Sequence, residues 1–218
     1  MKVEIFSDIV CPWCYIGERR FMRALAEFPG GSDVEIVLRP YQLDPTAPER
    51  PIPLREYLSA RYGPGMSRMT EAVSAAGAED DLEFAWDDAL AVNTMTAHRL
   101  LRLAAIEGGI SVQRALLERL FEAHFSRGED VSDHETLVAH AAAVGMSADR
   151  VRAYLASGEG EAELRAELEE ARALGVRSVP TFVFDEEYAV SGAQPVHVFR
   201  QVLEEVRRRR MAGIAGSA

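Results

Sequence analysis

The sequence predicts an α/β fold in which a sheet domain is interrupted by a large inserted all-helical domain. Three observations indicate it. A strand, a helix and a second strand follow one another at the start of the chain, and residues 54–171 then show only helical patterns. Two short strand-like runs and a helix close the chain. We therefore expect the two ends to build one sheet in a βαβ-ββα order, with the middle folding as the insert.

The first 40 residues have the pattern of a βαβ unit. Residues 2–6 (KVEIF) are rich in apolar side chains and predict a strand, and residues 34–38 (VEIVL) predict a second, largely buried one. Between them, apolar residues recur every three or four positions from Trp13 to Phe28, until Pro29-Gly30-Gly31 ends the helix. A right-handed crossover then starts the helix at the C-terminal edge of the first strand.

The middle of the chain predicts helices and no strands. Residues 44–53 hold four prolines and predict an extended linker. Glycine-rich breaks divide the residues beyond it into helical segments. The helices expected are 54–62, 66–76, 86–108, 112–126, 134–144, 148–156 and 161–174.

The C-terminal part predicts a hairpin and a last helix. Residues 181–184 (TFVF) and 188–191 (YAVS) read as strands joined by an acidic turn, although no Asn-Gly dipeptide marks it. A helix is expected from 195 to 210, and residues 211–218 are expected to form a flexible tail.

Composition narrows the classes of function. Lys and Arg number 24 and Asp and Glu 35, so the net charge is 24 − 35 = −11, which argues against nucleic acid or anionic membranes as partners. No stretch approaches the roughly 20 apolar residues of a membrane helix, and the N-terminus lacks the apolar centre of a secretory signal. We therefore expect a cytoplasmic protein.

The stretch SDIVCPWCY (7–15) holds both cysteines of the chain, Cys11 and Cys14. The predicted junction of strand and helix places the Cys11 sulfur at the helix N-terminus, where free N–H groups and the helix dipole stabilise a thiolate. Pro12 suits the first helical turn, and Trp13 tunes the site without adding positive charge. We expect Cys11 to be the exposed nucleophile and Cys14, deeper and with a higher pKa, to resolve the mixed disulfide.

Two other interpretations of the cysteine pair are weaker. A structural disulfide closing so short a ring would remove little chain entropy. A zinc site needs two more ligands, and His98, His124, His134, His140 and His197 show no paired spacing beyond positions 134 and 140. No metal is expected.

Several motifs together resemble one protein family. FSDIVCPWCYIG (6–17), VPTFVF (179–184) and SGAQP (191–195) resemble the DsbA-like branch of the thioredoxin superfamily. More specifically, the chain is similar to FrnE-type dithiol oxidoreductases, relatives of 2-hydroxychromene-2-carboxylate isomerases and kappa-class glutathione transferases. The resemblance implies a discontinuous thioredoxin-like domain (1–45 and 172–210) around a helical insert (54–171).

The resemblance also implies roles for residues beyond the cysteines. The bond between Val179 and Pro180 is expected to be cis and to face the CxxC, where the backbone of Val179 pairs with a bound peptide like an added strand. The superfamily often buries an acid where this chain has Ile5. Asp8 could replace that acid through water, or could serve as a cap or turn residue.

A second family-like motif, NTMTAHRL (93–100), contains Asn93 and His98. Its simplest interpretation is a helix cap and a packing histidine with satisfied hydrogen bonds. In the isomerase and transferase relatives this region helps to line the substrate cleft, so these two residues are also candidates for binding.

The leading hypothesis is a cytoplasmic thiol-disulfide oxidoreductase that exchanges disulfides through Cys11 and Cys14, with Val179 and Pro180 positioning the partner. Protein thiols or disulfides, or glutathione as a redox co-substrate, are the expected partners, and no bound cofactor is expected. One alternative is a glutathione-dependent isomerase or transferase acting on a small aromatic or polyketide-like molecule. Another is a redox-independent holdase chaperone. The chain is expected to be a monomer or a homodimer.

Overall fold

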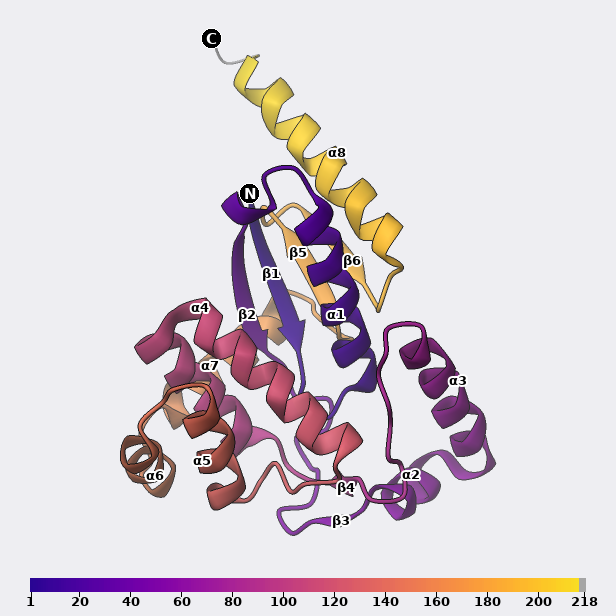
Figure 1. Cartoon of the computed structure of the whole chain (residues 1–218), viewed down its shortest axis with the longest axis vertical. Coiled ribbons are helices and arrows are strands. Elements are labelled where there is room, and N and C mark those ends of the chain that lie inside the picture. Colours follow the sequence, from indigo (N-terminus) through magenta and orange to yellow (C-terminus); the bar gives the residue numbers. More distant parts are fainter. Residues whose placement is uncertain (216–218) are drawn as a thin grey trace.

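A computed structural model describes residues 1–215 of the chain (Figure 1). The strands are β1 (Lys2–Ser7), β2 (Glu35–Pro40), β3 (Ile52–Pro53), β4 (Leu90–Ala91), β5 (Thr181–Phe184) and β6 (Tyr188–Ser191). The helices are α1 (Pro12–Glu27), α2 (Leu54–Tyr62), α3 (Met66–Ala78), α4 (Met95–Ser126), α5 (His134–Ala143), α6 (Ala148–Ala156), α7 (Glu161–Ala173) and α8 (Val196–Ala215). None of these helices is both long enough and apolar enough to cross a bilayer.

The two ends of the chain build one mixed sheet, as the sequence predicts. Its strand order is β2-β1-β5-β6, with β1 and β2 parallel and the other pairs antiparallel. Helices α1 and α8 lie side by side on one face of this sheet (Figure 1). The core between them is aromatic, because Phe21 of α1, Phe182 of β5 and Phe199 of α8 pack ring against ring at 4.7–5.4 Å. This α/β architecture fixes the position of α1.

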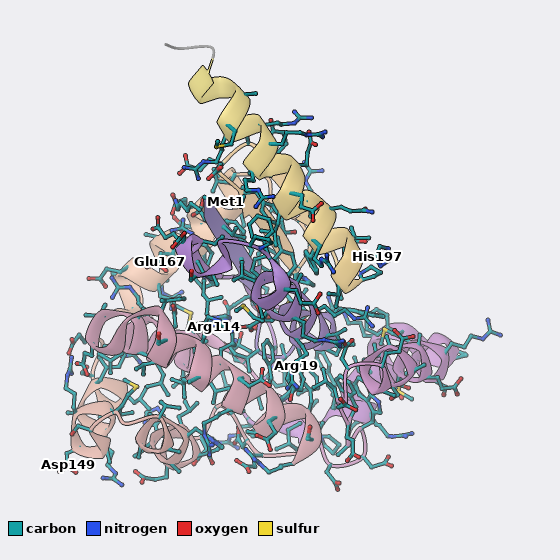
Figure 2. All side chains as sticks on the ribbon, turned by 45° about the horizontal axis from the view of Figure 1, so that its top comes forward. Met1, Arg19, Arg114, Asp149, Glu167 and His197 are labelled. Carbon is teal, nitrogen blue, oxygen red and sulfur yellow. The ribbon has the colours of Figure 1, made fainter. Side chains whose placement is uncertain are left out.

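The helical insert lies at the end of the sheet where α1 begins (Figure 1). Sheet domain and insert share buried contacts, because Tyr15 of α1 stacks on Phe121 of α4 with ring centroids 5.0 Å apart. Figure 2 labels Arg19 of α1 and Arg114 of α4 at this junction, where they pair with Glu118 and Glu18. The cysteine end of α1 is therefore enclosed by α4. The domain boundaries given above stay a prediction.

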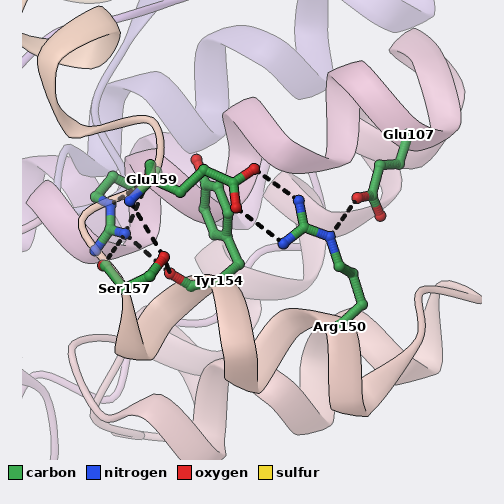
Figure 3. Close-up of polar contacts among 6 residues, drawn as sticks. Glu107, Arg150, Tyr154, Ser157 and Glu159 are labelled. Carbon is green, nitrogen blue, oxygen red and sulfur yellow. Dashed lines mark hydrogen bonds and ion pairs between the residues drawn. The ribbon is translucent and has the colours of Figure 1, made fainter.

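Ion pairs and buried cations join the helices of the insert (Figure 3). Arg150 of α6 binds both carboxylate oxygens of Glu159, at 2.8 and 3.1 Å, and Glu107 of α4 at 2.9 Å. The buried Arg99 of α4 donates to the main-chain carbonyls of Tyr154, Ser157 and Glu159 at 2.6–3.0 Å. The Tyr154 carbonyl belongs to the last turn of α6 and the other two follow its end, where a helix leaves its acceptors free, so Arg99 serves as a buried C-terminal cap.

The middle of the chain differs from the prediction in two ways. β3 and β4 pair antiparallel through Ile52 with Ala91 and Pro53 with Leu90, so the prediction of no strands there is wrong. The helix expected over 86–108 begins only at Met95, because residues 90–91 belong to this ladder. Within α4, Gly109 has a non-helical backbone with φ 69° and divides the element into two helical segments, which confirms the break expected between 86–108 and 112–126.

The predicted hairpin is present, and its turn uses acidic residues in place of Asn-Gly. Asp185 and Glu186 both have positive φ, 47° and 61°, between β5 and β6. Helix α8 continues through Ala215, beyond residue 210 where we expect it to end. The rest of the segment expected as a tail, residues 216–218, lies outside the described residues.

Candidate active site

Cys11 lies at the junction between β1 and α1, as predicted. It is the N-cap residue of α1, with φ −95° and ψ 109°, and Pro12 follows as the first helical residue. The Cys11 N–H donates to the Asp8 carbonyl at 3.0 Å, and the Cys11 carbonyl accepts from the Cys14 N–H at 3.0 Å. The turn from Asp8 to Cys11 therefore directs the chain into the helix, with the first sulfur at its positive end.

Both thiols are free and both are buried, with exposed fractions of 3% for Cys11 and 1% for Cys14. The expected exposure of Cys11 is therefore wrong. Burial raises the pKa of Cys14 well above its usual value, and the adjacent Cys11 thiol raises it further. The Asp8 backbone amide and the Ser7 hydroxyl act in the opposite direction. Cys14 is thus the deeper thiol, and it keeps its proton at neutral pH.

The segment that covers Cys11 contains the predicted cis bond between Val179 and Pro180. The Cys11 thiol donates to the Val179 carbonyl, with 3.5 Å between Sγ and oxygen. Gly17 of α1 permits the close approach, because a Cβ there would lie 2.9 Å from Cγ of Pro180. The sequence analysis did not single out Gly17, although a glycine inside a helical pattern is a signal of close packing.

Asp8 and His98 form a buried pair beside the thiols. They are 1% and 4% exposed, and His98 Nε2 lies 3.1 Å from Asp8 Oδ1 and 3.0 Å from the Tyr41 carbonyl oxygen. Both neighbours are acceptors, so Nε2 carries the hydrogen and donates to them. Asp8 Oδ2 accepts from the Leu43 N–H at 2.8 Å. The structure therefore brings together two candidates that lie 90 positions apart.

Asn93 lies elsewhere and organises the chain. Its side-chain oxygen accepts from the Met95 N–H at 3.0 Å, and its amide nitrogen lies 3.4 Å from the carbonyls of Pro45 and Ala47. It thus ties the proline-rich linker to the first residue of α4, one position before the N-cap residue Thr94. Trp13 is half-buried and packs against the core that contains both cysteines.

Glu18 and His124 are titratable groups whose burial the sequence analysis did not predict. Glu18, one turn after Cys14, has an oxygen without a hydrogen-bond partner, and burial raises its pKa to about 7 against the opposing effect of Arg114. His124 has no partner at either ring nitrogen, and burial lowers its pKa to about 4. No spacing in the sequence marks either side chain as buried.

The described residues contain no group of three or more His, Cys, Asp or Glu side chains that could hold a metal ion. A thiol at a helix N-terminus with a second thiol one turn away can form and break a disulfide with little backbone movement.

Comparison with known proteins decides the family. Residues 2–204 match the model of the DSBA-like thioredoxin domain. The chain belongs to this family. The crystal structure of a probable DsbA oxidoreductase from Streptomyces coelicolor is 40% identical, with a TM-score of 0.87 over 94% of this chain and 89% of that one. The DSBA-like fold expected from the motifs is thus confirmed, and the family is one of thiol-disulfide oxidoreductases.

Two solved structures of lower sequence identity share the fold of this chain. The cytosolic disulfide reductase DsbM from Pseudomonas aeruginosa, in a structure with GSH, is 19% identical with a TM-score of 0.68, over 95% of this chain and 100% of that one. A 2-hydroxychromene-2-carboxylate isomerase is 14% identical with a TM-score of 0.67, over 97% and 98%. The narrower similarity to FrnE-type proteins stays a prediction.

Proposed function

We propose that the protein exchanges disulfides with a substrate through Cys11 and Cys14. One observation carries the proposal: the Cys11 sulfur lies at the N-terminus of α1, next to Cys14 and opposite the carbonyl that precedes the cis proline. Membership of an oxidoreductase family agrees with it.

The proposed exchange has two steps. In the reducing direction the Cys11 thiolate attacks a substrate disulfide, forms a Cys11–substrate disulfide and releases the other substrate sulfur, which takes up a proton. Cys14 then loses its proton and attacks the Cys11 sulfur, so that a Cys11–Cys14 disulfide forms and the second substrate thiol leaves. Two electrons pass from the protein dithiol to the substrate, and the oxidising direction is the reverse.

Cys11 is 3% exposed and its thiol donates to the Val179 carbonyl, so we propose that a substrate disulfide displaces this contact when it reaches the sulfur. We propose that the backbone around Val179 and Pro180 instead pairs with the substrate chain as an edge strand. Trp13, half-buried beside the pair, shapes the same approach.

Protein disulfides and glutathione are the proposed partners. The disulfide reductase DsbM has been solved with GSH, which supports glutathione as a co-substrate here. We propose that the protein is located in the cytoplasm. The redox potential of the glutathione pool there is about −220 to −300 mV, so a Cys11–Cys14 pair of intermediate reduction potential is mostly in the dithiol form. The protein would then act as a reductase or isomerase.

A glutathione redox titration tests the proposal. The wild type should show one reversible two-electron transition in which both thiols disappear together, and the Cys11→Ser/Cys14→Ser variant should show none. Thiols that react one at a time, each without the other, would contradict dithiol exchange. Suppression of aggregation of an unfolded protein that survives in the double variant would favour the holdase alternative. Turnover of an aromatic substrate with glutathione in that variant would favour the isomerase or transferase.

A further inference from the structure

We infer that Arg20 of α1 is a positioning residue for the proposed exchange, because it holds the segment 179–180 in place opposite the Cys11 sulfur. It acts through the main-chain carbonyl of Ala193, in the loop that follows β6. The inference rests on the proposed function, since this segment is the one proposed to pair with the substrate chain.

Arg20 is a buried cation whose head group is fixed by its neighbours. It is 8% exposed, and its Nε donates to Asp80 Oδ2 at 2.5 Å. Its Nη2 donates to the Ala76 carbonyl and to Glu79 Oε2, both at 3.0 Å. Asp80 is itself buried, so a carboxylate compensates the buried charge. These partners lie at the C-terminal end of α3 and just after it, and α3 lies beside α1 (Figure 1).

The third nitrogen of Arg20 reaches the loop between β6 and α8. Nη1 donates to the Ala193 carbonyl at 3.2 Å. The other hydrogen bonds of residues 192–194 lie within the loop or join it to its own hairpin. Within residues 1–215, Arg20 is therefore the one side chain of a helix that hydrogen-bonds to this loop.

The loop packs on α1 and on Pro180 at the same point. The Gly192 N–H donates to the Pro180 carbonyl at 2.8 Å. At Gly17, three residues before Arg20, an added Cβ would lie 3.4 Å from Cα of Ala193 and 2.9 Å from Cγ of Pro180. The loop and Pro180 therefore share one face of α1, and Arg20 holds the loop there.

Pro180 connects the loop to the sulfur. It follows Val179, whose carbonyl accepts from the Cys11 thiol with 3.5 Å between oxygen and Sγ. Holding the loop therefore has two consequences. The carbonyl covers the sulfur, and the segment is ordered before a substrate chain pairs with it. A segment that is already ordered loses less freedom on binding, so the substrate binds more tightly.

Arg23, one turn further along α1, offers a matched control. Its Nη1 donates to Asp80 Oδ1 at 2.9 Å, so it shares this carboxylate with Arg20. Its side chain is 53% exposed, and no hydrogen bond of the described residues joins it to Ala193. Lysine at either position keeps a cation beside Asp80. It has one nitrogen in place of three, so Arg20→Lys cannot bind Asp80 and Ala193 together.

Two reagents separate the two consequences. Iodoacetamide is small and needs only an uncovered sulfur, whereas the disulfide-linked dimer of a short cysteine peptide also needs the ordered segment. The Cys14→Ser protein is the parent, so that Cys11 alone reacts, and Arg20→Lys and Arg23→Lys are added to it. Mass spectrometry follows the thioether or the mixed disulfide that forms on Cys11.

We expect Arg20→Lys to change the two rates in opposite directions. Alkylation of Cys11 should be about fivefold faster, because the carbonyl covers the sulfur for less of the time. Attack on the peptide disulfide should be about fivefold slower, because the segment is no longer held for pairing. A factor of five is roughly the effect of one net hydrogen bond. Arg23→Lys should match the parent with both reagents.

Two measurements check the fold of the variants. Thermal unfolding shows whether each one folds. In the Cys11→Ser protein, alkylation of the buried Cys14 reports a general loosening of the core, and Arg20→Lys should not change it. Arg20→Gln carries the test if Arg20→Lys does not fold. Its amide nitrogen lies where Nε of arginine lies, so it keeps the bond to Asp80 and loses the bond to Ala193. Arg23→Gln is then the control.

The results separate the two proposals. Unchanged rates in Arg20→Lys, changes of the same sign with both reagents, or equal changes in Arg23→Lys would overturn the positioning role. Faster alkylation of Cys14 would also overturn it, because Arg20 would then only stabilise the core. A parent whose Cys11 is alkylated but does not attack the peptide disulfide contradicts the proposed exchange. The alkylation rates alone then decide whether Arg20 holds the segment.

Discussion

Stability between pH 5 and 7 should depend on His124. Burial lowers its pKa to about 4, against about 6.5 for an unperturbed histidine. The unfolded chain therefore binds the proton first, and the contribution of this group to stability is present above pH 6.5 and lost as the pH falls through 4. Each pKa unit is worth about 1.4 kcal/mol, so a decrease from pH 7 to 5 should cost about 2 kcal/mol of the free energy of unfolding.

Glu18 should act in the opposite direction over the same range. Burial raises its pKa to about 7, from an ordinary value of 4.5. Its contribution is therefore fully present below pH 4.5 and is lost as the pH rises through 7, which gives a gain of about 2 kcal/mol on going from pH 7 to 5. The contributions of Glu18 and His124 nearly cancel, so removing either group should reveal the effect of the other.

Urea unfolding of the wild type, His124→Phe and Glu18→Gln at pH 5 and 7 measures these effects. We compare the free energy of unfolding of each variant with that of the wild type at the same pH. For His124→Phe this difference should be about 2 kcal/mol more favourable at pH 5 than at pH 7, and for Glu18→Gln it should be about 2 kcal/mol less favourable. His197→Gln on the surface is the control, since its side chain is exposed. If His124→Phe follows the wild type at both pH values, the reasoning from its burial is refuted.

Three further substitutions test the packing around the site. Gly17→Ala places a methyl group 2.9 Å from Cγ of Pro180 and should cost about 1–3 kcal/mol in thermal unfolding, with slower attack by Cys11. Arg99→Met leaves three carbonyls without their donor and should cost about 3 kcal/mol in urea unfolding, whereas Arg150→Met removes exposed ion pairs and a contact with the Tyr154 ring and should cost much less. Asn93→Ala should cost about 1 kcal/mol through the lost cap and leave thiol exchange unchanged.

The following results would contradict these three expectations. A stabilised Gly17→Ala protein would mean that Pro180 shifts to accommodate the added methyl group at little cost. If Arg99→Met and Arg150→Met lose the same free energy of unfolding, Arg99 does not act as a buried cap. A change in the rate of thiol exchange in Asn93→Ala would indicate that Asn93 acts in substrate binding and not only in holding the linker.

The sheet and the position of Cys11 could be predicted because they depend on local patterns. Strand-length apolar runs predict β1, β2 and β5, and the break at Pro29 ends α1 where expected. The β3–β4 pair could not be predicted, since a ladder of two residues on each side has no periodicity to detect. The same pair delays the start of α4 to Met95.

The surroundings of the thiols depend on contacts between distant parts of the chain. Val179 lies 168 positions after Cys11, and its carbonyl covers the sulfur that local reasoning leaves exposed. Asp8 and His98 appeared separately as candidates, but only the packing of α4 against the sheet domain joins them. Burial of Glu18 and His124 is likewise a property of the interface between α1, α4 and the rest of the core, not of their own segments.

Mass analysis of single-cysteine variants with oxidised glutathione tests the central claim most directly. Cys14→Ser should accumulate one glutathione on Cys11, and peptide mapping should find it there. Cys11→Ser should stay unmodified while folded, because Cys14 is buried and protonated. Glutathione on Cys14 in Cys11→Ser, with Cys11 unreactive in Cys14→Ser, would contradict the assignment of the nucleophile.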